Sequence, residues 1–183
     1  MLAKELKKNG NIVYGIEIDP EQAEIAKGIC EKVFVGNIED TQFDLPERFF
    51  DVIVFADVLE HLRKPEDVLI EMKRFLKDDG FMVISLPNIA HISMRKNLLF
   101  GSFDYDELGI LDRTHLRFFT LKAALELIHN CGFKILSTDI TIPSISRINS
   151  TNKKYSPLFK TYYALSNSWR TGLAYQFIFK ISK

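Results

Sequence analysis

Three titratable side chains, Asp57, Glu60 and His61, directly follow a short apolar run from Val52 to Ala56. The run is too short for a helix and is typical of a strand that is buried on both faces in a parallel sheet. In open α/β sheets ligands bind beyond the carboxyl ends of the strands, so titratable groups at that position predict a functional site. The alternative is an ordinary connection from strand to helix with solvated polar side chains.

The chain has 183 residues, which is enough for one domain with a real hydrophobic core. Its 24 basic and 24 acidic residues cancel, and this balance argues against general nucleic-acid binding. No acidic residue follows Asp139, whereas seven basic residues do. This basic end leaves an anionic substrate or surface open as a binding partner.

Cys30 and Cys131 are far apart in the sequence and lie in helix-like surroundings. We interpret them as reduced core thiols rather than as a disulfide. The first eight residues are charged, without an apolar signal core, and no apolar run approaches the length that crosses a membrane. We therefore expect a cytoplasmic protein without a membrane span.

Hydrophobic periodicity and capping residues predict the elements that position these groups. Asp19 is placed to cap a helix that begins at Pro20, and Thr120 is placed to cap another. The expected helices cover 2–8, 20–30, 65 to about 79 with Gly80 at the end, and 120–131. The expected strands cover 12–18, 32–35, 52–56, 81–86, 133–142 and 173–181. This order predicts an α/β fold, a doubly wound sheet with an antiparallel C-terminal edge.

No repeat or low-complexity tract marks a second domain, so we expect a single domain over 1–183. Residues 88–119 have weak periodicity and many aromatic side chains, and we interpret them as a lid or substrate-facing insertion. Residues 143–171 are basic with interleaved aromatics and are expected to form a cap. That cap either holds an anionic acceptor, such as a sugar phosphate or glycolipid head group, or only covers the last two strands.

Five groups of residues, considered together with their order and spacing in the chain, carry a family resemblance. They are Val13–Pro20, Val35–Glu39, Phe50–Val54 with Leu59–Leu62, Ser85–Asn88, and Leu111–Thr120. Together they resemble the class I S-adenosylmethionine-dependent methyltransferases, of the group that includes small-molecule and glycan O-methyltransferases. The resemblance implies a Rossmann-like fold, S-adenosylmethionine as cofactor, and methyl transfer to a hydroxyl of a small molecule or glycan.

The same resemblance assigns cofactor-binding residues at the ends of the early strands. Glu17 would accept hydrogen bonds from the ribose hydroxyls, and Asn37 stands where the family usually has an Asp that contacts the adenine amino group. Ile16, Ile18 and Ile38 would pack around the adenine face, although all three could equally be plain core. Asp57, at the end of the next strand, is also assigned to cofactor binding.

The base that removes the acceptor's proton is expected to be His61 or His115, the two histidines inside family-like motifs. Either could instead be structural. The set Asp57, Glu60, His61 and His115 is also similar to the divalent metal site of small-RNA 2′-O-methyltransferases and to the Glu-His pattern of ubiquinone-pathway O-methyltransferases. Oxygen and imidazole ligands suit a divalent cation, but Asp57 stands where those families have Glu.

The beginning of the chain departs from the family pattern. No strand with a Gly-rich turn precedes Glu17, and the first glycine is Gly10 at a predicted helix end. We therefore expect the first strand of the family fold to be missing and cofactor binding by this chain alone to be poor. A fragment, a late-started gene product and a degenerate copy all remain open.

Two other functions compete with the methyltransferase interpretation. The first is a non-catalytic remnant or partner-binding module that recruits the missing strand from another chain, which leaves a dimer open. The second is a nicotinamide-dependent oxidoreductase, which shares an acid after the second strand. It is disfavoured because the glycine fingerprint is absent.

Overall fold

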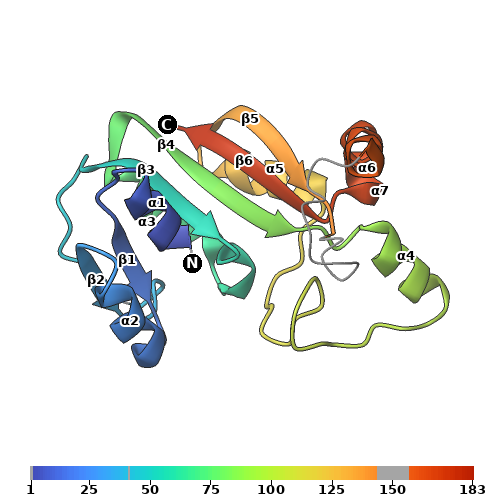
Figure 1. Ribbon diagram of the computed structural model, residues 1–183, viewed down its shortest axis with the longest axis horizontal. Coiled ribbons are helices and arrows are strands. Elements are labelled where there is room, and N and C mark those ends of the chain that lie inside the picture. The colour runs from blue at the N-terminus through green and yellow to red at the C-terminus, as the bar shows by residue number, and fades with distance from the viewer. Residues whose placement is uncertain (1, 41, 144–156) are drawn as a thin grey trace. The chain divides into compact units, whose positions relative to one another are not determined.

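The computed structural model describes residues 2–40, 42–143 and 157–183 (Figure 1). The chain divides into two compact units, Met1–Pro46 and Glu47–Lys183. Each unit has its own sheet. The expectation of a single domain over 1–183 stays a prediction.

The first unit contains two helices and a parallel pair of strands. They are α1 (Leu2–Lys8), β1 (Tyr14–Glu17), α2 (Pro20–Lys27) and β2 (Lys32–Val35). The Asp19 carboxylate accepts hydrogen bonds from the Glu21 and Gln22 amides, and Pro20 opens the helix, which confirms the predicted cap of α2. Glu17 is the last residue of β1, and the capping residue Asp19 of α2 follows closely after it.

The second unit is built on a sheet with strand order β3-β4-β6-β5. These strands are β3 (Phe50–Ala56), β4 (Leu76–Pro87), β5 (Lys134–Thr141) and β6 (Gln176–Ser182). β3 and β4 run parallel, whereas β6 is antiparallel to both β4 and β5. The predicted α/β architecture with antiparallel C-terminal strands is confirmed.

The remaining helices connect these strands, and Figure 1 shows them along the chain. They are η1 (Leu59–His61, a 3₁₀ turn), α3 (Pro65–Lys73), α4 (Ile92–Leu99), α5 (Leu121–Asn130), α6 (Pro157–Ser168) and α7 (Arg170–Leu173). Thr120 caps α5 as predicted, because its hydroxyl accepts from the Ala123 amide. After the helix ends, Gly132 adopts a φ of 70°, which a residue without a side chain tolerates.

The core of the second unit lies along β4 and β6. Their side chains alternate between buried and partly exposed, and the buried ones face each other across the antiparallel pair. Met82 lies opposite Ile181, Ile84 opposite Phe179, and Leu86 opposite Phe177, and all six are fully buried. Such cross-strand apolar pairs bury enough surface to fix the register, since a slip by one residue would turn them to the other face.

The prediction that β3 is buried on both faces was wrong. Ile53 and Phe55 are buried, but Val52 and Val54 remain 40% and 37% exposed. The face of β3 that carries Val52 and Val54 is therefore only partly covered.

The predicted end of the helix from Pro65 was also wrong. α3 ends at Lys73, and β4 begins at Leu76, so that Gly80 lies within β4. The Arg74 carbonyl accepts from the Arg48 amide, and the Phe75 carbonyl accepts from the amides of Phe49 and Phe50 at the start of β3. These long-range bonds draw the chain into the sheet, where periodicity alone had continued the helix.

The predicted accessory segments are described only in part. Residues 88–119 contain α4 and the isolated bridge of Asn88 with Phe119, and the role of a lid stays a prediction. Of the predicted cap over 143–171, residues 144–156 lie outside the described residues, and α6 and α7 form most of the rest. Cys30 and Cys131 are buried free thiols, as predicted. Across the described parts of the chain, no helix combines the length and apolar character that a bilayer span needs.

Candidate functional site

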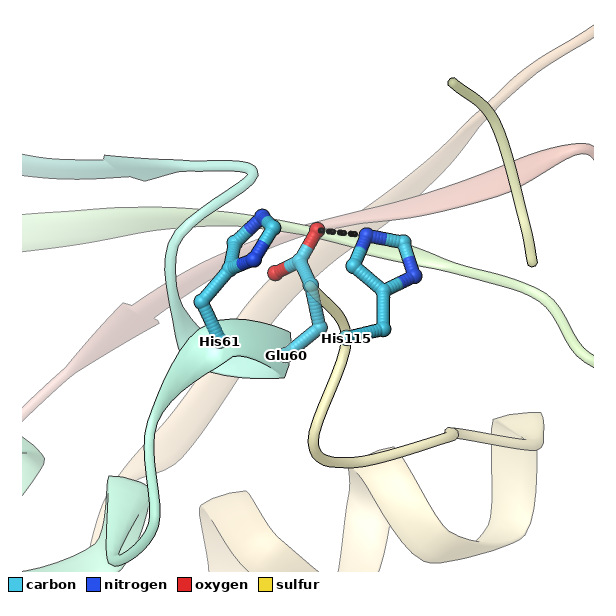
Figure 2. A group of neighbouring side chains, drawn as sticks. All are labelled: Glu60, His61 and His115. Carbon is cyan, nitrogen blue, oxygen red and sulfur yellow. Dashed lines mark ion pairs between the residues drawn. The ribbon is translucent and has the colours of Figure 1, made fainter. Parts of the chain in front are cut away.

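Glu60, His61 and His115 come together just beyond the carboxyl end of β3 (Figure 2). One ligand atom from each of the three side chains lies within 4.8 Å of the others. Glu60 and His61 belong to η1, whereas His115 comes from the loop before α5. The Glu60 carbonyl accepts from the amides of Leu116 at 2.8 Å and Arg117 at 2.9 Å, which holds that loop against η1.

The Glu60 carboxyl group is the most deeply buried polar part of the site. The residue is 1% exposed, and neither carboxyl oxygen forms a hydrogen bond with any of the described residues. Burial raises the pKa of Glu60 from 4.5 to about 7, and the negative charges of Asp57 and Asp112 add to this effect. Near neutral pH this carboxyl group can therefore hold or release a proton, or take a cation.

His115 faces Glu60 with its Nε2 atom. The distance from Nε2 to the Glu60 Oε1 atom is 4.0 Å, and the dashed line in Figure 2 marks this pair. The Nδ1 atom lies 3.0 Å from the Ile110 carbonyl oxygen, which can only accept a hydrogen bond. Nδ1 therefore carries a hydrogen, and in the neutral ring the lone pair lies on Nε2, toward the buried carboxyl group.

His61 is half-buried and packs edge-to-face against His115, with 4.8 Å between the ring centroids. Its Nδ1 atom lies 3.1 Å from the Thr114 hydroxyl oxygen and 3.2 Å from the Thr114 carbonyl oxygen. The two histidines thus differ in accessibility, because His115 is buried and His61 is not.

Asp57, the fourth predicted ligand, makes other contacts. Its Oδ1 atom accepts from the Ser85 hydroxyl at 2.9 Å and from the Gln176 amide at 2.7 Å. Its backbone has a φ of 54°, an uncommon conformation for a residue other than glycine. Asp57 therefore links the ends of β3 and β4 to the start of β6, and the close group of ligand atoms comprises the other three residues.

The predicted cofactor residues Glu17, Ile18, Asn37 and Ile38 lie in the first unit. The Glu17 Oε1 atom accepts from the Asp19 amide at 3.0 Å, which leaves the other oxygen of this partly exposed carboxylate for a ligand hydroxyl. Ile18 is 65% exposed, so an apolar surface lies next to that carboxylate. The chemistry of this end of β1 fits a ribose with an adjoining planar base.

Asn37 and Ile38 follow β2 at its carboxyl end. The Asn37 Oδ1 atom accepts from the Glu39 amide at 3.0 Å, and its Nδ2 atom donates to Asp40 at 2.8 Å. An amide oxygen has two lone pairs, so Oδ1 retains one for the adenine amino group. Ile38 is half-buried. Both positions are compatible with the predicted contacts to adenine.

Sequence reasoning missed the roles of Asn88 and Thr114. Asn88 is fully buried at the end of β4 and donates to the Ala174 carbonyl at 2.8 Å, which ties this strand to the segment before β6. Both residues fall inside motifs that carried the family resemblance. The sequence signal that could have revealed these roles was a short polar side chain at a strand end or turn, because such side chains often form hydrogen bonds with nearby backbone groups.

We predict that Glu60 makes stability depend on pH. Its pKa in the folded state exceeds 4.5, so its stabilising contribution is complete below about pH 4.5 and is lost as the pH rises through about 7. Glu60→Gln keeps the volume but cannot ionise. Urea unfolding at pH 4.5 and 7.5 measures the free energy of unfolding of wild type and variant. The difference between the two proteins should change by about 3 kcal/mol from one pH to the other, because the wild type loses stability toward pH 7.5. Glu66→Gln, at an exposed position, gives the reference curve. Parallel curves for wild type and Glu60→Gln would refute the assignment.

The chain resembles known proteins over most of its length. Residues 1–138 match the family model described as a methyltransferase domain. An uncharacterized protein of Methanocaldococcus jannaschii is 31% identical in an alignment of 176 positions, which covers 87% of this chain and 65% of that protein. The ubiquinone biosynthesis O-methyltransferase of a Shewanella species is 22% identical in an alignment of 136 positions, which covers 71% of this chain and 57% of that enzyme. The chain thus spans about two thirds or less of the length of these relatives.

Solved structures show the same fold. The crystal structure of an S-adenosylmethionine-dependent methyltransferase from Archaeoglobus fulgidus superimposes with a TM-score of 0.67 at 14% identity, over all of this chain and 80% of that one. The family match covers 1–138 of the 183 residues and confirms the resemblance to methyltransferases, while the O-methyltransferase group stays a prediction. The chain belongs to the methyltransferase-domain family.

Proposed function

We propose that the protein transfers a methyl group from S-adenosylmethionine to a hydroxyl group of a small molecule or glycan. The observation that carries this proposal is the convergence of Glu60, His61 and His115 beyond the carboxyl end of β3. Removal of a hydroxyl proton needs a base, and imidazole is the side chain most often used near neutral pH. The similarity to an O-methyltransferase over 71% of this chain supports oxygen as the accepting atom.

S-adenosylmethionine supplies an activated methyl carbon, so the protein has mainly to align the reactants and take up the acceptor's proton. In this proposal Glu17 binds the ribose hydroxyls, and Asn37 accepts from the adenine amino group. Ile18 and Ile38 contact the adenine. Asp57 uses Oδ1 for Ser85 and Gln176, so the proposal assigns its Oδ2 atom to the cofactor.

His61 is the better candidate for the base. It is half-buried, so an acceptor can reach it, and the Thr114 contacts occupy Nδ1 and leave Nε2 for the proton. His115 is buried and its Nε2 atom faces Glu60, so we assign it to that carboxyl group rather than to the acceptor.

A divalent cation is a second proposal for the same group. The Glu60 oxygens lack hydrogen-bond partners among the described residues, and the Nε2 lone pair of His115 faces them. A cluster of acceptors is stabilised by a positive charge, and carboxylate with imidazole suits Zn²⁺ or Mn²⁺. The ligands would be Glu60, His61 and His115, with Asp57 committed to Ser85 and Gln176.

The alternative of a non-catalytic remnant or partner-binding module is not favoured, since no observation on the described residues points to it specifically. A dimer stays a prediction.

The first test of the proposed function concerns cofactor binding. S-adenosylmethionine and its demethylated product are titrated, by calorimetry, into this chain and into a version extended upstream in frame. Glu17→Gln should weaken binding about tenfold or more, because one charge-assisted hydrogen bond is lost. Glu21→Gln, an exposed acid in the first turn of α2, is the matched control and should bind like wild type. Absence of binding by both lengths of the wild-type protein would overturn the proposed function.

The second prediction concerns the base. With S-adenosylmethionine and a panel of hydroxyl-bearing sugars and phenols, the demethylated cofactor should form only when an acceptor is present. His61→Asn should lower the turnover number about 100-fold, the usual contribution of a general base, and leave cofactor affinity unchanged. His129→Asn alters an exposed histidine of α5 and should leave turnover unchanged. Equal turnover in wild type and His61→Asn would exclude His61 as the base.

The third prediction concerns the metal. Zn²⁺ or Mn²⁺ at about 100 times its dissociation constant should raise the melting temperature by about 5 °C. Glu60→Gln should abolish most of this increase, whereas His129→Asn should retain it. If Mg²⁺, Mn²⁺ and Zn²⁺ all leave the melting temperature of the wild type unchanged, no metal site exists there.

A further inference from the structure

The side chain of Thr114 lies between Asp112 and His61. The Asp112 Oδ1 atom accepts from the Thr114 amide at 2.8 Å and from the Thr114 hydroxyl at 2.5 Å. On the other side, the Thr114 hydroxyl oxygen is 3.1 Å from the His61 Nδ1 atom. The three side chains therefore form one hydrogen-bonded chain that ends at the histidine proposed as the base.

The direction of each hydrogen bond in this chain follows from chemistry. An ionised carboxylate only accepts, and the hydrogen bonds from Thr114 keep the pKa of Asp112 below its usual range. The single hydroxyl hydrogen of Thr114 therefore points to Asp112, so the hydroxyl oxygen offers a lone pair to His61. The Thr114 carbonyl, 3.2 Å from the same nitrogen, also only accepts. Both partners of Nδ1 are acceptors, and Nδ1 must carry the hydrogen.

We propose that Asp112 and Thr114 are positioning residues that hold neutral His61 as the Nδ1–H tautomer, with the lone pair on Nε2. The role of this tautomer in proton transfer rests on the proposed function. The acceptor hydroxyl gives its proton to Nε2, which makes the ring an imidazolium. The oxygen keeps the electron pair of the O–H bond and bonds to the methyl carbon, while the C–S bond breaks and its pair stays on sulfur. A ring with the opposite tautomer could not accept this proton at Nε2.

The same short loop orients both histidines. The Ile110 carbonyl holds Nδ1 of His115, as Thr114 holds Nδ1 of His61. The Asp112 carbonyl accepts from the His115 amide at 3.1 Å, so the turn that positions Thr114 also positions the second ring. The segment 110–115 thus gives both rings the same tautomer through partners that only accept.

The test is nitrogen NMR of the chain with ¹⁵N-labelled histidine, at a pH where the rings are neutral. The shifts of Nδ1 and Nε2 report which nitrogen carries the hydrogen, and His61→Gln assigns the signals. Wild-type His61 should show Nδ1–H predominating. Thr114→Val leaves only the backbone carbonyl as acceptor, so the ratio of Nδ1–H to Nε2–H should fall about fivefold, the equivalent of one neutral hydrogen bond.

Thr114→Ser is the matched control, since it retains the hydroxyl and should retain the wild-type ratio. Asp112→Ala frees the Thr114 hydroxyl hydrogen to turn toward His61, and should shift the ratio in the same direction as Thr114→Val. The signals of His115 show in each variant whether the loop is intact. If they change in Asp112→Ala, the loop is disturbed, and the comparison of Thr114→Val with Thr114→Ser decides the proposal. Nε2–H predominating in the wild type, or an unchanged ratio in Thr114→Val, would overturn the proposal.

The NMR measurement needs neither cofactor nor acceptor, so its failure overturns the positioning role alone. Failure of the cofactor titration overturns the proposed function and leaves the tautomer result standing. If both hold, Thr114→Val should lower the turnover number and leave the KM for S-adenosylmethionine unchanged, and Thr114→Ser should restore turnover.

Discussion

The two hydrogen bonds that the Glu60 carbonyl accepts from Leu116 and Arg117 are the contact on which the candidate site depends. They join η1, which follows β3 directly, to a loop more than fifty residues later in the chain. Because the loop lies over η1, the Glu60 carboxyl group loses its water and His115 is brought to face it. The raised pKa of this carboxyl group is therefore a consequence of backbone pairing, and the chemistry of the site follows from the fold.

The sequence predicted local features well and long-range ones poorly. Asp19 and Thr120 were recognised as helix caps because a cap depends on the next three residues only. The end of α3 was missed because the carbonyls of Arg74 and Phe75 are bonded to residues 48–50, a contact that no periodicity reveals. The partial exposure of β3 was missed for a similar reason, since an apolar run does not disclose what packs against each face of a strand.

The candidate site shows the same division. Glu60, His61 and His115 were all singled out from residue type and motif, and the structure brings them together. Their separate environments could not be predicted, because burial of His115, partial exposure of His61 and the lack of partners for Glu60 depend on the packed loop. Thr114 was overlooked because a threonine in a turn has no chemical signal until its neighbours are known.

The position of β6 has a consequence for synthesis of the protein. This strand follows both β4 and β5 in the chain, yet it lies between them in the sheet. Until β6 has been synthesised, β4 and β5 have no common partner, and each presents an unpaired edge. The sheet of the second unit can close only after residues 176–182 have left the exit tunnel. Until then the nascent chain exposes strand edges that other chains can pair with, so chaperone binding during this interval should protect it from aggregation.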